Sequence, residues 1–271
     1  MLVIANNLTT RRSLIERIFR QSQAAKWDSE QPAADKLKET ARQCAAAGAN
    51  LLEIDTQQHF DRPEAVEFAV KAVQQATNLP LCLSTNNVEA LEAGLRLCRR
   101  PPLVNYVSID VTRIKEVLPL VAKYQAEVVL LVSDPAAPTD AREMLEKAAI
   151  LIGAANEAGV PSSRILVDPG IIHISKDIGQ RHLAEVFEFL RALSEATEPP
   201  VRSTCWLSNI SAAAPRRFHW LLETSLLLTL AGAGLSSVFI DVLQRENRRA
   251  LRLVRIFNNE LVYSDGELSL S

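Results

Sequence analysis

Residues 48–55 read GANLLEID, and the pattern in this stretch recurs along the whole chain. Gly48 follows a segment of helical periodicity, Ala33–Ala47, and stands where a left-handed helix C-cap is common. The short apolar run Leu51–Asp55 comes next and is typical of a strand buried on both faces of a parallel sheet. Pro63 then stands near the start of another helical segment, where proline is tolerated. The stretch therefore predicts a helix–strand–helix unit.

The same alternation extends in both directions along the 271 residues. The predicted strands are Leu2–Ala5, Leu51–Asp55, Leu79–Ser84, Leu103–Ile109, Glu127–Val132, Ile165–Asp168, Ser203–Leu207 and Ser236–Val242. The predicted helices are Ala33–Ala47, Pro63–Thr77, Val88–Cys98, Arg113–Tyr124, Thr139–Ala158, Ile178–Glu195, Arg217–Ala231 and Gln244–Phe257. Eight alternating units, without GxGxxG after the first strand, favour an α/β fold with a single (β/α)₈ TIM barrel over residues 1–271. We expect Gln23–Pro32 to form a flexible loop, and the tail from Leu261 to pack on the barrel or reach a neighbouring subunit.

Composition and charge narrow the class of protein. Hydrophobic residues make up 48% and the net charge is −2, so no basic field attracts nucleic acid or an anionic membrane. The N-terminus lacks the basic flank of a signal peptide, and the apolar stretch Trp220–Ala233 contains Glu223 and is too short to span a bilayer. Four scattered cysteines and four dispersed histidines indicate reduced thiols and no metal site. We therefore expect a cytoplasmic protein.

Polar residues gather at the C-terminal ends of the predicted strands, where TIM barrels carry their active sites. Asn6 and Asn7 are predicted to follow the first strand, and Asp168 and Asn209 each follow an apolar run in which a buried polar group needs a partner. The set is rich in amides and carboxylates, which suits a planar heterocycle with alternating donors and acceptors. It contains no nucleophile beside an obvious base, so it suits covalent catalysis poorly. For any single Asn or Ser at a strand end, a helix-capping or turn role is an equal alternative.

Several strings, in this order, resemble one enzyme family. They are Gly48–Asp55, Leu81–Asn86, Glu92–Leu95, Leu103–Asn105, Val167–Pro169, Trp206–Ser211, Arg217–Phe218, Leu227–Leu228, Ala231–Gly232 and Phe239–Asp241. The ordered set resembles the pterin-binding methyltransferases that act on methyltetrahydrofolate and a corrinoid protein. Dihydropteroate synthase shares this barrel more distantly.

The resemblance implies roles for particular residues. Asn105 and Asp168 match ring-binding positions, and Asn209 matches the asparagine near N5, whose methyl group is transferred to cobalt of a corrinoid (cobalamin) on a partner protein. Asn209 is therefore expected to be catalytic, because an amide near N5 strengthens its hydrogen bond as charge develops. The other expected substrate-binding residues are Ser84, Glu53, Asp55, Arg217 and Asp241. Family members pair as homodimers, so we expect a homodimer, with the apolar helix Trp220–Leu230 in the core or the interface.

The sequence also departs from the family pattern. Ser84 stands where an aspartate is usual, which removes a charge-assisted hydrogen bond worth ~1.5–3 kcal/mol. Asn6 stands where the first strand usually has a glutamate, and Asp55 replaces an asparagine. Besides the methyltransferase, two alternatives remain: a divergent pterin-binding barrel with altered substrate or no activity, and, ranked lower, a dihydropteroate synthase-like enzyme. Replacing Ser84 with Asp is expected to tighten folate binding if the ring lies as in the family.

Overall fold

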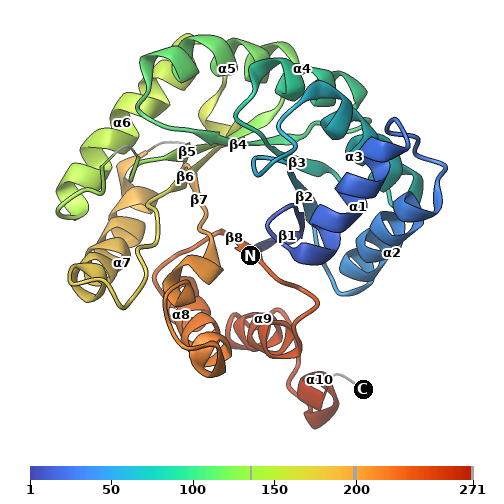
Figure 1. Cartoon of the computed structure of the whole chain (residues 1–271). Coiled ribbons are helices and arrows are strands. Elements are labelled where there is room, and N and C mark those ends of the chain that lie inside the picture. Colours follow the sequence, from blue (N-terminus) through green and yellow to red (C-terminus); the bar gives the residue numbers. More distant parts are fainter. Residues whose placement is uncertain (135, 198–199, 270–271) are drawn as a thin grey trace.

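The computed structural model describes residues 1–134, 136–197 and 200–269, and within these ranges eight parallel strands form one sheet. They are β1 (Leu2–Thr9), β2 (Leu51–Asp55), β3 (Leu81–Ser84), β4 (Leu103–Val107), β5 (Glu127–Leu131), β6 (Ile165–Asp168), β7 (Arg202–Ser203) and β8 (Ser237–Ile240). Consecutive strands are neighbours from β1 to β7, and β1 also pairs with β8. A parallel bridge between Trp206 and Phe239 joins the chain after β7 to β8. The sheet is thus a nearly closed (β/α)₈ TIM barrel, as the sequence predicts (Figure 1).

Helices form the outer ring of the barrel (Figure 1). They are α1 (Ser13–Ala24), α2 (Pro32–Ala46), α3 (Pro63–Ala76), α4 (Val88–Leu97), α5 (Val111–Lys123), α6 (Ala141–Glu157), α7 (Gly179–Ala196), α8 (His219–Gly232), α9 (Arg245–Phe257) and α10 (Asp265–Ser269), with 3₁₀ helices η1 (Ser162–Arg164), η2 (Leu207–Ser211) and η3 (Arg216–Phe218). Gly48 follows α2 with φ +95°, which confirms the predicted left-handed position. Pro63 is the first residue of α3, also as predicted.

Two predictions near the N-terminus are wrong. The first strand extends to Thr9, because Leu8 and Thr9 resume the pairing with β2 after a register irregularity that follows Ala5, so Asn6 and Asn7 lie within β1. The Asn7 side chain donates to Asp241 and accepts from the Val242 N–H. The predicted loop Gln23–Pro32 is too long, because α1 extends to Ala24 and α2 begins at Pro32. Helix α1 was not predicted; it is mostly polar and buries four side chains, those of Ile15, Ile18, Phe19 and Ser22.

The predicted seventh strand is also too long. Its pairing with β6 covers Arg202–Ser203, and the chain turns into η2 at Leu207. Beyond this pairing the chain is hydrogen-bonded to β8. For example, the Phe239 N–H donates to the Cys205 carbonyl at 2.8 Å. The tail from Leu261 contains α10, which packs against α9 and accepts a bond from Arg249 at the Leu268 carbonyl.

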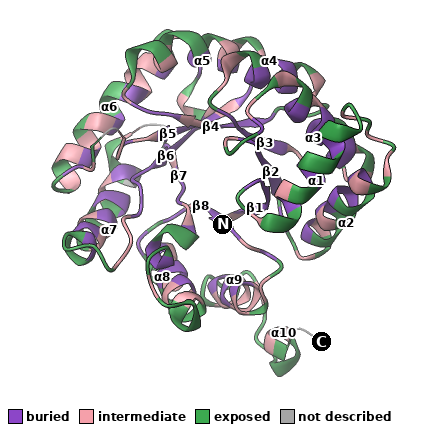
Figure 2. Cartoon of the chain, viewed as in Figure 1, coloured by how far each residue is buried: buried purple, intermediate pink, exposed green. Residues whose placement is uncertain are grey.

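Buried residues line the strands and the inner faces of the helices (Figure 2). The larger apolar cluster fills the space between strands and helices. A smaller cluster fills the interior of the barrel with inward-facing side chains from seven strands, namely Ile4, Leu51, Cys82, Leu103, Val129, Leu166 and Phe239. The barrel interior is therefore a packed plug, on which the next layer of side chains rests.

Candidate active site

The next inward-facing layer is mostly polar. Side chains on a strand alternate between two faces, so each inward residue is followed by another two positions later. Two residues beyond the apolar plug stand Asn6, Glu53, Ser84, Asn105, Leu131, Asp168 and Asp241. The change from apolar to polar along six of these strands marks the C-terminal mouth of the barrel, the end that carries active sites in this fold.

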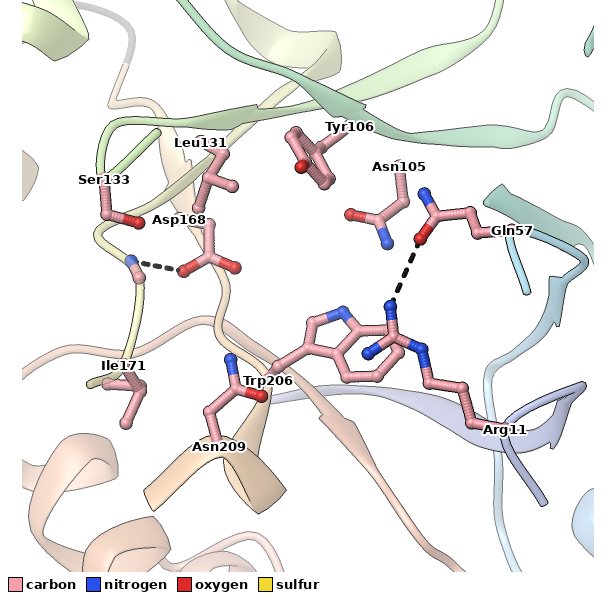
Figure 3. A pocket seen from close by; sticks show the side chains of 11 residues that line it. Arg11, Gln57, Asn105, Tyr106, Leu131, Ser133, Asp168, Ile171, Trp206 and Asn209 are labelled. Atoms are coloured by element: carbon pink, nitrogen blue, oxygen red, sulfur yellow. Dashed lines mark hydrogen bonds between the residues drawn. The ribbon is translucent and has the colours of Figure 1, made fainter. Parts of the chain in front are cut away.

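A pocket opens at this mouth (Figure 3). Three residues predicted from the sequence, Asn105, Asp168 and Asn209, line it together although they come from β4, β6 and η2. Its other lining residues are Arg11, Gln57, Tyr106, Leu131, Ser133, Gly170, Ile171 and Trp206. The structure thus brings together the predicted catalytic residue and both principal ring-binding residues.

Asp168 is the buried acid of this pocket. One carboxylate oxygen accepts a hydrogen bond from the Gly170 N–H at 2.7 Å. Burial raises the pKa of Asp168 to about 7, and the Gly170 N–H opposes this rise. Among the described residues none donates to the second oxygen, which Figure 3 shows on the pocket side. Asp168 can therefore accept a hydrogen bond from a ligand when it is ionised.

Replacing Gly170 with alanine is expected to destabilise the protein by about 1–3 kcal/mol. Gly170 has φ +74°, and an added Cβ would lie 2.5 Å from the Ser133 Cβ. Chemical denaturation would measure the loss, with Gly153→Ala as the control, since a Cβ at Gly153 in α6 meets no atom within 4 Å. Equal stability of Gly170→Ala and wild type would contradict the expected clash.

Glu53, Ser84 and Asn105 form a hydrogen-bonded cluster on three adjacent strands. The Ser84 hydroxyl donates to Glu53 Oε1, and Asn105 Nδ2 donates to the same oxygen at 3.2 Å and to Ser84 Oγ at 2.9 Å. Burial raises the pKa of Glu53 to about 8; Asp55 adds to the rise, and the bonds from Ser84 and Asn105 oppose it. Asn105 lines the pocket, whereas Glu53 and Ser84 are not among its lining residues.

The remaining predicted residues lie outside this pocket. Asp55 is buried and accepts from Thr9 Oγ1 at 2.7 Å, and it forms an ion pair with Arg11 at 3.4 Å. Asp241 pairs with Arg12 at 2.9 Å and lines a neighbouring polar pocket that also includes Asn6. The Arg217 side chain is exposed, and its guanidinium lies 4.8 Å from the centre of the Phe218 ring.

Trp206 and Arg11 line the pocket but were not singled out from the sequence. The indole of Trp206 stacks on Phe239, with ring centres 5.4 Å apart, and the Arg11 guanidinium lies 5.7 Å from the indole centre. Gln57 accepts a bond from Arg11 at 3.3 Å (Figure 3). Trp206 lies within the string Trp206–Ser211, which was a usable signal, whereas Arg11 precedes a helix that the sequence did not reveal.

The side chains of the mouth favour recognition over covalent chemistry. Among the described residues, no group of three His, Cys, Asp or Glu side chains could hold a metal ion. The cysteines are free, and burial raises the pKa of Cys44 and Cys98 to about 12 and those of Cys82 and Cys205 well above 9.0. An aromatic surface, an amide oxygen and a carboxylate around one pocket suit a flat heterocycle with N–H donors. No described helix is long and apolar enough to cross a membrane.

Comparisons with known proteins agree with this picture. A family model described as pterin binding enzyme matches residues 25–224. A methylcorrinoid:tetrahydrofolate methyltransferase of Eubacterium limosum is 27% identical over an alignment of 196 residues, and the match covers 69% of this chain and 69% of that one. Dihydropteroate synthase from Xanthomonas albilineans in complex with 7,8-dihydropteroate has a TM-score of 0.67 at 15% identity, covering 97% of this chain and 94% of that one. The enzyme from Vibrio fischeri has a TM-score of 0.68 at 12% identity, covering 96% and 93%. At these identities the two solved structures show the shared fold alone.

Proposed function

Because the chain belongs to the pterin-binding enzyme family, we propose that it is a methyltransferase moving a methyl group between N5 of tetrahydrofolate and the cobalt of a corrinoid protein. The observation that carries the proposal is the meeting of Asn105, Asp168 and Asn209 in one pocket. The name of the Eubacterium limosum relative supports the methyl donor and acceptor. Asn105 and Asp168 would equally serve a synthase that joins a pterin to a second substrate, so Asn209, assigned to the methyl-bearing N5, is the residue that favours the methyltransferase.

Four of the pocket residues have a part in the proposed reaction. Asn105 and Asp168 bind the pterin through its N–H groups, and the Trp206 indole covers a face of the ring. The Asn209 amide donates a hydrogen bond toward N5, which strengthens as the departing amine gains charge. The corrinoid, carried by a partner protein, is the second substrate and accepts or supplies the methyl group. Fixing the ring leaves N5 oriented for in-line transfer.

A two-part experiment tests this function. Calorimetric titration with methyltetrahydrofolate measures binding, and absorbance spectroscopy follows methyl transfer to cobalt(I) cobalamin. We expect saturable binding and transfer. The absence of binding at millimolar ligand overturns the proposal, and binding without transfer favours a divergent pterin-binding barrel that has lost the reaction.

We also propose that two copies of the chain pair through the outer face of α8. Trp220, Leu221, Ser225 and Thr229 are exposed on this helix, and none of them is charged. The acid of α8, Glu223, is buried and accepts from Ser211 at 2.6 Å. A solvated helix face normally carries charge, so this face is typical of an interface.

Replacing Leu221 with arginine is therefore expected to convert a dimer into a monomer. A two-fold interface places each substitution at two sites, so the desolvation cost of the arginine is doubled. Light scattering across a concentration series measures the mass. The matched control is Ile150→Arg, at a residue that is 59% exposed on α6. A monomeric wild type, or a dimeric Leu221→Arg variant, contradicts the proposal.

A further inference from the structure

Resting on the function proposed above, we infer that Ser84 and Glu53 are positioning residues that fix the orientation of the Asn105 amide. In this orientation Asn105 offers its oxygen to the ligand and keeps its nitrogen within the protein. The ligand must then present an N–H donor at this side of the pocket. The pterin edge that faces Asn105 is therefore a donor edge.

The three residues are held by the sheet itself. Ser84 on β3 pairs in register with Asn105 on β4, and Glu53 is on β2, the strand on the other side of β3. Their exposed fractions are 0% for Glu53, 2% for Ser84 and 5% for Asn105. Side chains packed this tightly on adjacent strands cannot exchange partners without moving the sheet. The cluster is consequently a rigid support beneath the mouth.

The bonding pattern allows a single orientation of the amide. Both hydrogens of Asn105 Nδ2 are used, one on Glu53 Oε1 at 3.2 Å and one on Ser84 Oγ at 2.9 Å. Ser84 has one hydroxyl hydrogen, and it is donated to Glu53. A reversed amide would give up both Nδ2 bonds and would set its oxygen against Ser84 Oγ, whose single hydrogen is already donated to Glu53. The Asn105 oxygen therefore points into the pocket, as Figure 3 shows.

Ser84 owes this role to its size and its neutral hydroxyl. An aspartate at position 84 would place a second carboxyl group against the buried Glu53, whose second oxygen has no hydrogen-bond partner among the described residues. Two carboxyl groups in such a site disfavour each other's ionised form. Aspartate would also lack the hydroxyl that donates to Glu53, so on this inference we expect Ser84→Asp to bind methyltetrahydrofolate more weakly, the opposite of the expectation from the sequence.

Calorimetry with methyltetrahydrofolate on wild type and four variants, Ser84→Ala, Ser84→Thr, Ser84→Asp and Ser237→Ala, tests the inference. Ser84→Ala is expected to bind about two- to tenfold more weakly than wild type, because one orienting hydrogen bond is lost. Ser84→Thr keeps the hydroxyl and restores affinity to within about twofold of wild type. Ser237→Ala is the matched control, since Ser237 is buried on β8 and donates to the Ser203 carbonyl at 2.7 Å, outside the mouth.

The outcomes distinguish a failure of this inference from a failure of the proposed function on which it rests. If wild type does not bind methyltetrahydrofolate, the proposed function itself fails. If wild type binds and Ser84→Ala binds equally well, the function stands and the positioning role is overturned. Equal losses in Ser84→Ala and Ser237→Ala, or tighter binding by Ser84→Asp, overturn it as well. Thermal melting of each variant shows whether it is folded.

Discussion

Replacing Asn209 with alanine is expected to lower the rate of methyl transfer by about 10²–10³-fold. Asn209 stands on η2, and its side chain lines the pocket beside Trp206 and Asp168. Its amide contributes to the reaction as charge develops on N5, so its removal raises the barrier more than it weakens ground-state binding. Affinity for methyltetrahydrofolate should therefore stay within about threefold of wild type.

The measurement is the transfer rate at saturating methyltetrahydrofolate, combined with calorimetric affinity. Ser208→Ala is a matched control, because Ser208 is exposed on the same 3₁₀ helix and faces the neighbouring pocket. It should transfer methyl groups at the wild-type rate. A parallel loss of affinity and rate in Asn209→Ala would make Asn209 a binding residue, and an unchanged rate would remove it from the reaction.

Replacing Asp168 with asparagine is expected to weaken binding of methyltetrahydrofolate by about 10–100-fold, the value of a charge-assisted hydrogen bond. Asp168 is 5% exposed, so water does not compensate for the lost charge. The side-chain oxygen of asparagine can still accept the hydrogen bond that the Gly170 N–H now donates to Asp168, so the local fold is kept. Calorimetry measures the change, with the exposed Asp177→Asn as the control. Wild-type affinity in Asp168→Asn would show that the ring does not contact this side chain.

Protonation of Asp168 makes both the stability of the fold and the affinity for the ligand depend on pH. Burial raises the pKa of Asp168 from 3.8 to about 7, so the folded protein retains a proton that the unfolded chain releases between these values. Its contribution to stability is therefore present at low pH and is lost as the pH rises through about 7. Ligand N–H donors favour the ionised form, so affinity should rise from pH 6 to pH 8. Asp168→Asn should lack this rise and should melt no lower than wild type at pH 8.

Local patterns identified most of the barrel. Strands β2 and β6 match their predicted bounds, because strands buried on both faces contain consecutive apolar residues that a short window detects. Helix α1 was missed although its buried residues Ile15, Ile18, Phe19 and Ser22 have the i, i+3, i+4, i+7 spacing of an amphipathic helix, which is a local signal. Strand β7 was predicted too long, since the apolar run Cys205–Leu207 is buried by η2 packing and a bridge to β8 rather than by a β-ladder.

The sequence by itself determined the alternation of strands and helices; it placed Asn105 within the fourth strand, Asp168 at the end of the sixth and Asn209 just after the seventh. The alternation, and the position of a polar residue along it, depend on the hydrophobic pattern of one short segment, and neighbouring residues in the sequence carry that pattern. Only the tertiary structure decided that Asn105 and Asp168 face the pocket, that Glu53 and Ser84 lie beneath Asn105, and that Asp241 lines a different pocket. The partner of an inward-facing side chain is set by the register of the adjacent strands and by the loops above them. Residues far apart in the chain supply both, so the window that reveals a strand cannot reveal what its polar residues contact.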